Sequence, residues 1–96
     1  MQSSEMDACI EAYVSGRVQG VFFRQFTKDT ATSLELKGYV KNLADGRVKV
    51  VARGDPESIE KLLNRLHEGP AMASVEGVNY RWVTECEEFR DFDIRR

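Results

Sequence analysis

The spacing of the apolar residues changes at residue 23, and this change constrains the fold more than any other feature of the sequence. Ile10, Ala12 and Val14 occupy alternate positions, which is the two-residue period of a strand with one buried face. Beyond residue 22 the period becomes helical, and the residues three or four positions apart are Phe23, Phe26, Thr27, Thr30, Ala31 and Leu34. We therefore predict a strand over residues 7–17 and a helix from residue 23 to about residue 38.

The middle of the chain predicts a hairpin followed by a second helix. Residues 37–43 and 47–53 are strand-like and flank Asp45-Gly46, a dipeptide that suits the positive φ angles of hairpin turns. Asp55 and Pro56 have the chemistry of a helix N-cap and of a first helical residue, and a Gly-Pro pair ends the segment. The apolar stripe of this helix consists of Ile59, Leu62, Leu63 and Leu66.

The last third of the chain predicts two further strands. Residues 75–83 contain an alternating set, which is Val78, Tyr80 and Trp82. A short final strand contains Phe89, Phe92 and Ile94. The resulting order, βαββαβ with a short terminal strand, predicts an α+β fold: a ferredoxin-like α/β sandwich in which an antiparallel sheet is covered by two helices on one face.

Length and hydropathy indicate one domain without membrane contact. A chain of 96 residues can close one hydrophobic core but not two, so we expect a single domain over residues 7–96 behind a flexible tail over residues 1–6. No apolar run approaches the roughly 20 residues that span a bilayer, and the first residues lack the regions of a signal peptide. We expect a cytoplasmic location and a monomer.

The segment between the first strand and the first helix is the most specific stretch for function. It reads SGRVQGVFFR over residues 15–24. Its two glycines suit a turn with positive φ angles, and the amides before Arg24 fall where a helix begins, a place that binds anions. The forked guanidinium of Arg24 matches two oxygens of a phosphate. The predicted phosphate-binding loop comprises Gly16, Arg17, Val18, Gln19, Gly20, Val21, Phe22, Phe23 and Arg24.

The charge distribution favours a small anion over a nucleic acid as the ligand. Residues 12–54 contain eight Lys or Arg against three Asp or Glu, although the whole chain has a net charge of −2. A long polyanion usually needs a broad basic face. An RNA-recognition module shares this strand and helix order, but it also needs exposed aromatics on its third strand, and residues 47–53 contain none. We therefore expect no nucleic-acid partner.

The other reactive side chains predict no second catalytic site and no metal site. His67 is the only histidine and lies at the end of an amphipathic helix, which indicates a surface residue and not a member of a triad or a metal site. Cys9 and Cys86 are too few for a disulfide framework and lack Cys-x-x-Cys spacing, so we expect reduced thiols. The glycine loop also lacks the Lys-Ser/Thr ending of a nucleotide P-loop. We predict no metal and no cofactor.

Three motifs of the chain resemble the acylphosphatase family, and the resemblance extends from about residue 8 to residue 95. The motifs are GRVQGVFFR at residues 16–24, GYVKNL at residues 38–43 and DGRVKV at residues 45–50. The resemblance implies a metal-free hydrolase of carboxyl–phosphate anhydrides such as acetyl phosphate, with inorganic phosphate as product and competitor. It implies that Arg24 binds the phosphate and that Asn42 orients the attacking water.

Two alternatives stay open at this point. An anion-binding regulatory domain could keep the same loop without turnover, and a fold alone does not distinguish binding from catalysis. For Asn42, the alternative to a catalytic role is that of a turn residue at the end of a strand.

Overall fold

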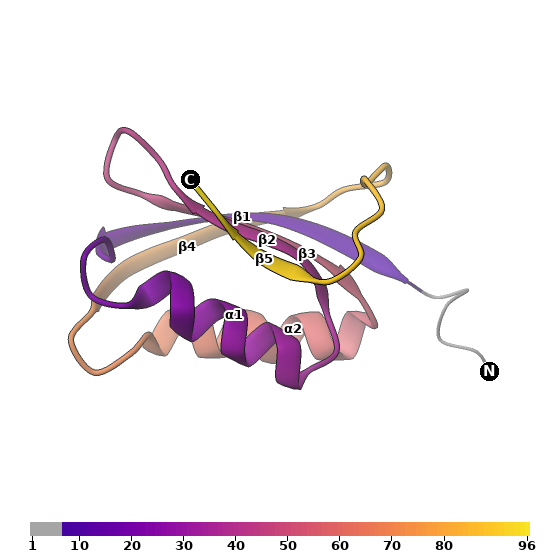
Figure 1. Cartoon of the computed structure of the whole chain (residues 1–96), viewed down its shortest axis with the longest axis horizontal. Helices are drawn as coiled ribbons and strands as arrows, with labels where there is room; N and C mark the ends of the chain where they lie inside the picture. Colours follow the sequence, from indigo (N-terminus) through magenta and orange to yellow (C-terminus); the bar gives the residue numbers. More distant parts are fainter. Residues whose placement is uncertain (1–6) are drawn as a thin grey trace.

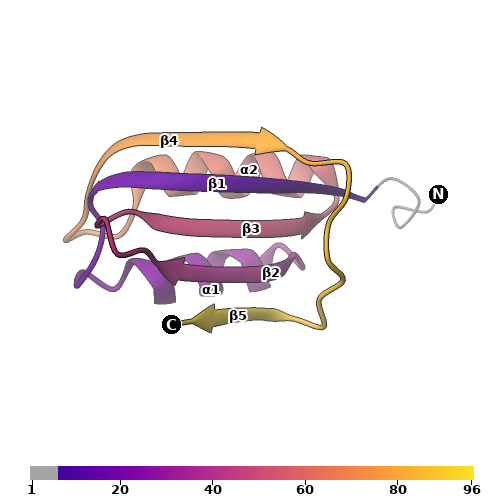
Figure 2. The ribbon, with the colours of Figure 1, turned by 90° about the horizontal axis from the view of Figure 1, so that it is seen from above.

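The computed structural model describes residues 7–96, and the tail that we predict over residues 1–6 lies outside them. In chain order the elements are β1 (Ala8–Arg17), α1 (Phe23–Ser33), β2 (Lys37–Asn42), β3 (Val48–Gly54), α2 (Pro56–Glu68), β4 (Ser74–Trp82) and β5 (Phe92–Arg95). The strands form one sheet in the order β4-β1-β3-β2-β5, and both helices lie on the same face of it (Figures 1 and 2). The predicted α+β sandwich is confirmed.

The predicted alternation places one side of the sheet in the core. Ile10, Ala12 and Val14 of β1 are fully buried, as are Val48 and Val50 of β3. They pack against the helices, where the apolar stripe of α2 is buried over its whole length and consists of Ile59, Leu62, Leu63 and Leu66. Burying each of these four side chains contributes on the order of 1.5–3 kcal/mol before the loss of entropy. Neither helix of residues 7–96 has the length and apolar character that crossing a bilayer requires.

The first helix is shorter than the sequence predicts. It ends at Ser33, and the left-handed residue that follows is Glu35, with φ 62°. Gly38, near which we expected the helix to end, lies inside β2 with φ 145°. A Cβ at Gly38 would collide with the carbonyl oxygen of Val51 in β3. This glycine therefore permits close approach of two strands and does not end a helix.

The last strand departs from the predicted antiparallel sheet. Strands β1, β2, β3 and β4 pair antiparallel, whereas β5 pairs parallel to β2. After β4 the chain crosses from one edge of the sheet to the other along residues 83–91 (Figure 2). Because this segment stays at one end of the sheet, β5 starts beside the start of β2 and runs in the same direction. Phe89 lies in this segment and not in a strand, and its ring contacts Tyr39 edge-on with centroids 6.0 Å apart.

The prediction of reduced thiols is wrong. Cys9 of β1 and Cys86 of the 83–91 segment form a disulfide, with their Cα atoms 6.2 Å apart. The two residues are 77 positions apart in the sequence, and only the path of the crossing segment brings them together. The bond anchors this segment over the start of β1.

Reduction of the disulfide is expected to lower the thermal stability. A crosslink across a loop of this size stabilises a protein by roughly 2–4 kcal/mol, so adding a reductant should lower the melting temperature by about 10 °C or more. Thermal unfolding followed by circular dichroism, with and without dithiothreitol, measures this effect. The matched control is the double variant Cys9→Ser/Cys86→Ser, whose melting temperature should not respond to the reductant. Equal melting temperatures of the oxidised and reduced wild type would show that the disulfide contributes nothing.

Candidate active site

One end of the sheet brings the predicted site residues together. The loop after β1, the start of α1 and the ends of β2 and β5 all lie at this end (Figure 2). They enclose a pocket of about 320 Å³ that is lined by Val18, Gly20, Phe22, Phe23, Arg24, Gln25, Asn42 and Ile94. Arg24 and Asn42, which are 18 positions apart in the sequence, therefore line the same pocket. Four residues of the predicted loop do not line it: Gly16, Arg17, Gln19 and Val21.

The two glycines of the loop have the positive φ angles that the sequence predicts. Gly20 has φ 76° and no atom within contact distance of a built Cβ, so it serves the turn alone. Gly16 has φ 116° and lies at a bulge between β1 and β4, where a Cβ would collide with the carbonyl oxygen of Ser74. Between them Val18 is buried in the core, as is Val21 after Gly20. The buried side chains of Val18 and Val21 thus fix the loop to the core.

The N-terminus of α1 is left uncapped within residues 7–96. No side chain bonds to its first amides, its first turn holds no acidic residue, and the first backbone bond runs from the Phe26 N–H to the Phe22 carbonyl at 3.0 Å. The second helix is different, because Asp55 accepts a hydrogen bond from the Glu57 N–H at 3.3 Å. An uncapped helix start with its positive dipole end is a site for an external anion.

Phe22 has an unusual conformation for a bulky residue. It is the N-cap of α1 with φ 66° and ψ 24°, in the left-handed region. This conformation costs a residue with a side chain about 1–2 kcal/mol, and asparagine or glycine is commoner there. The Phe22 side chain is also 77% exposed. The folded state gains little from this ring, and its position on the pocket suggests a role in binding.

Gln19 connects the loop to the hairpin that carries Asn42. Its Nε2 donates to the carbonyl oxygens of Leu43, at 2.8 Å, and of Arg47, at 3.0 Å. Sequence analysis places Gln19 in the loop but gives no signal for this contact. The hairpin turn itself is held by Asp45, which accepts hydrogen bonds from the backbone and side chain of Arg47. The side-chain hydrogen bond from Arg47 is the main reason why the pKa of Asp45 is lowered from its usual value.

The two predicted catalytic side chains have unused hydrogen-bonding capacity within residues 7–96. The Arg24 side chain is partly buried on the pocket wall and takes part in no salt bridge among these residues. Asn42 Oδ1 is fully buried and accepts no hydrogen bond from them. A buried carbonyl oxygen without a donor costs about 1–3 kcal/mol.

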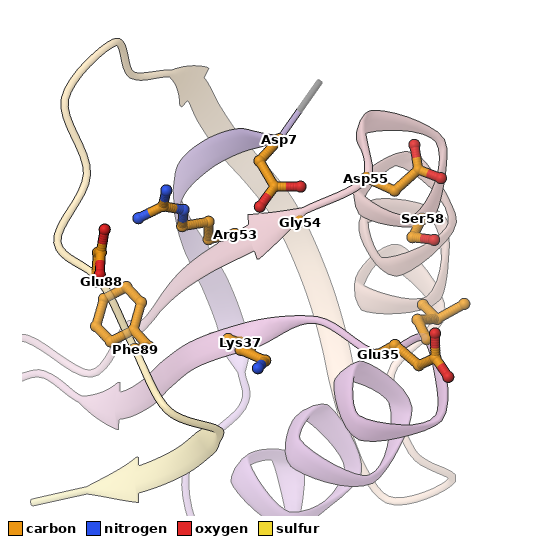
Figure 3. A pocket seen from close by; sticks show the side chains of 10 residues that line it. Asp7, Glu35, Lys37, Arg53, Gly54, Asp55, Ser58, Glu88 and Phe89 are labelled. Carbon is orange, nitrogen blue, oxygen red and sulfur yellow. The ribbon is translucent and has the colours of Figure 1, made fainter. Parts of the chain in front are cut away.

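A larger pocket of about 420 Å³ lies at the other end of the sheet and contains none of the predicted site residues (Figure 3). Its charged side chains are those of Asp7, Glu35, Lys37, Arg53, Asp55 and Glu88. Four carboxylates against two cations give it a negative balance, which disfavours a phosphate ligand. Within residues 7–96 there is also no cluster of three or more His, Cys, Asp or Glu that could hold a metal ion.

Two tyrosines lie on the sheet face that the helices leave open. Arg47 lies over the Tyr13 ring at 4.8 Å from the centroid, and Arg95 lies over the Tyr39 ring at 4.0 Å. RNA-binding sheets of this topology stack bases on such rings. Cations therefore lie over both tyrosine rings, and the expectation of no nucleic-acid partner stays a prediction.

Comparisons with known proteins point to one family. The family model for acylphosphatase matches residues 10–94. An acylphosphatase of Methanococcoides burtonii is 52% identical over 96 residues, which is the whole length of both chains.

Solved structures agree with these sequence matches. An acylphosphatase structure from Coxiella burnetii superposes with a TM-score of 0.92 at 43% identity and covers 99% of both chains. The Bacillus subtilis acylphosphatase structure has a TM-score of 0.90 at 30% identity, covering 93% of this chain and 99% of its own. From the family match, the full-length identity and the shared fold together, we conclude that the chain belongs to the acylphosphatase family.

Proposed function

We propose that this chain hydrolyses acyl phosphates to a carboxylate and inorganic phosphate without a metal ion. A water held by Asn42 attacks the phosphorus in line with the scissile bond, while Arg24 and the Gly16–Arg24 loop hold the phosphoryl oxygens. The observation that carries the proposal is the convergence of three features on one pocket: Arg24, the uncapped start of α1 and Asn42.

The phosphoryl group would occupy the positive part of the pocket. The amides at the start of α1 donate to its oxygens, and the guanidinium of Arg24 donates two parallel hydrogen bonds. Charge builds on these oxygens and on the leaving oxygen as the P–O bond lengthens. Donors that are fixed before the reaction stabilise this charge without further reorganisation.

The water would lie beside Asn42, on the opposite side of the phosphorus from the leaving group. The carboxamide of Asn42, a residue that lines the pocket, hydrogen-bonds to the water and so orients it. A carboxamide does not titrate in this range, so it orients the water without removing its proton beforehand. The contribution of Asn42 is therefore one of position.

The leaving group explains why no acid catalyst is needed. The P–O bond breaks toward the acyl oxygen, which leaves with the electron pair as a carboxylate. A carboxylic acid has a pKa near 4, so this anion is a weak base that departs without a proton. The site can therefore work with electrostatics and position alone.

Turnover in the presence of a chelator tests the proposal. We expect purified protein to release phosphate from acetyl phosphate with EDTA present, and inorganic phosphate to inhibit competitively. Glycerol phosphate is the matched control, because its alkoxide is a poor leaving group and its hydrolysis should not be accelerated. Phosphate binding without turnover would support the regulatory alternative instead, and activity that is lost in EDTA and restored by one metal would contradict metal independence. The monomeric state and the cytoplasmic location stay predictions.

A further inference from the structure

We propose that Phe22 and Ile94 form an apolar subsite for the acyl group, so that the enzyme prefers acyl phosphates with an apolar acyl chain. This inference rests on the proposed function and names the substrate class of the same pocket. Among the described residues the large hydrophobic side chains exposed to solvent are Phe22, Met72, Tyr80, Trp82 and Ile94. Two of them, Phe22 and Ile94, line the pocket that contains Arg24 and Asn42.

The backbone places both side chains at the pocket. The left-handed conformation of Phe22 keeps its ring 77% exposed at the start of α1. Ile94 is 36% exposed and belongs to β5, where it pairs with Val40, two residues before Asn42. The two residues thus come from different elements and lie on one pocket, next to the group that holds the phosphate.

The charges around the pocket disfavour an acyl group with a second negative charge. Arg24 is the only charged residue among the eight that line the pocket. Arg95 follows Ile94, but its guanidinium lies over the Tyr39 ring on the open face of the sheet, because neighbouring residues of a strand point to opposite faces. An acyl group with its own phosphate would find no second cation here, whereas a hydrocarbon chain would find the Phe22 ring and the Ile94 side chain.

The kinetics of a homologous series of substrates test this subsite. Acetyl, butanoyl and hexanoyl phosphate differ in chain length while their leaving carboxylates remain equally weak bases. We expect kcat/KM of the wild type to rise about 10-fold from acetyl to hexanoyl phosphate, since each methylene placed on an apolar surface favours binding. 1,3-Bisphosphoglycerate, whose acyl group carries a second phosphate, should show no such gain over acetyl phosphate.

Two variants locate the effect. Phe22→Asn keeps a residue that accepts the left-handed conformation and removes the ring, and Ile94→Thr keeps a β-branched residue in the strand. Each should reduce the preference for hexanoyl phosphate to about 3-fold or less. In Ile94→Thr, whose residue belongs to β5 and not to the phosphate-binding loop, the inhibition constant of inorganic phosphate should change little. Met72→Asn is the matched control, because it removes an exposed apolar side chain that does not line the pocket.

The outcomes separate this inference from the function on which it rests. If acyl phosphates are hydrolysed but kcat/KM does not depend on chain length, or if both variants keep the wild-type preference, the apolar subsite is wrong and the proposed function stands. If no acyl phosphate is hydrolysed by a folded wild type that still binds phosphate, the proposed function and the subsite are both wrong. A chain-length preference that disappears in either variant and persists in Met72→Asn supports the subsite.

Discussion

Arg24→Lys is expected to reduce kcat/KM for acetyl phosphate by about 10³-fold or more, because an arginine that stabilises a transferring phosphoryl group contributes an effect of that size. Lysine keeps the positive charge but presents a compact ammonium, which cannot donate two parallel hydrogen bonds to two phosphate oxygens. The inhibition constant of inorganic phosphate should rise as well. Steady-state kinetics with phosphate as inhibitor measures both quantities.

The matched control is Arg65→Lys, which makes the same change on the exposed surface of α2. Arg65 forms an ion pair with Glu68 and lies outside the pocket. This variant should keep wild-type kinetics. Wild-type turnover and phosphate inhibition in Arg24→Lys would show that the loop amides alone hold the phosphate and that Arg24 is a surface charge.

Asn42→Ala is expected to lower kcat by about 10²-fold or more while phosphate inhibition changes little, which is the size and pattern of a positioning effect. The reason is that alanine removes the carboxamide that orients the attacking water but leaves the phosphate donors in place. The measurement is kcat and KM for acetyl phosphate together with the inhibition constant of phosphate.

Asn79→Ala is the control for Asn42→Ala, because Asn79 is an exposed residue of β4 that does not line the pocket. Two other results would each change the mechanism. Loss of phosphate inhibition with unchanged kcat would make Asn42 a substrate clamp. A fall in melting temperature without a kinetic effect would leave it the strand-end residue of the alternative interpretation.

The order of strands and helices could be predicted because each element carries its own local pattern. The alternation around Ala12 and the stripe of α2 report which face is buried, and Asp55 with Pro56 marks a helix start independently of the rest of the chain. The turn at the loop glycines could also be predicted, because the ease with which glycine adopts a positive φ angle is a property of the residue itself. The role of Gly38 could not be predicted, because it depends on how closely the backbone of β3 approaches this residue.

Several features that sequence analysis missed depend on contacts between distant segments. The parallel pairing of β5 follows from the path of residues 83–91, and the disulfide follows from the same path. The hydrogen bonds of Gln19 to the hairpin and the presence of Ile94 on the pocket likewise join parts of the chain that no local pattern connects. A single sequence shows the side chains that make these contacts but not which residues become neighbours in the fold.

The position of β1 inside the sheet has a consequence for how the chain reaches its native state. The strand is flanked on one side by β3 and on the other by β4, with Ile10 opposite Trp82. Strands β1 and β4 lie far apart in the sequence, so bringing them together costs chain entropy before their contacts can stabilise the fold. Proteins with pairings of this kind fold slowly. The Cys9–Cys86 bond tethers β1 to the segment that follows β4, even when the chain is unfolded. In the oxidised chain β1 and β4 are therefore already held near each other when folding begins. In the reduced chain the two strands must meet by diffusion.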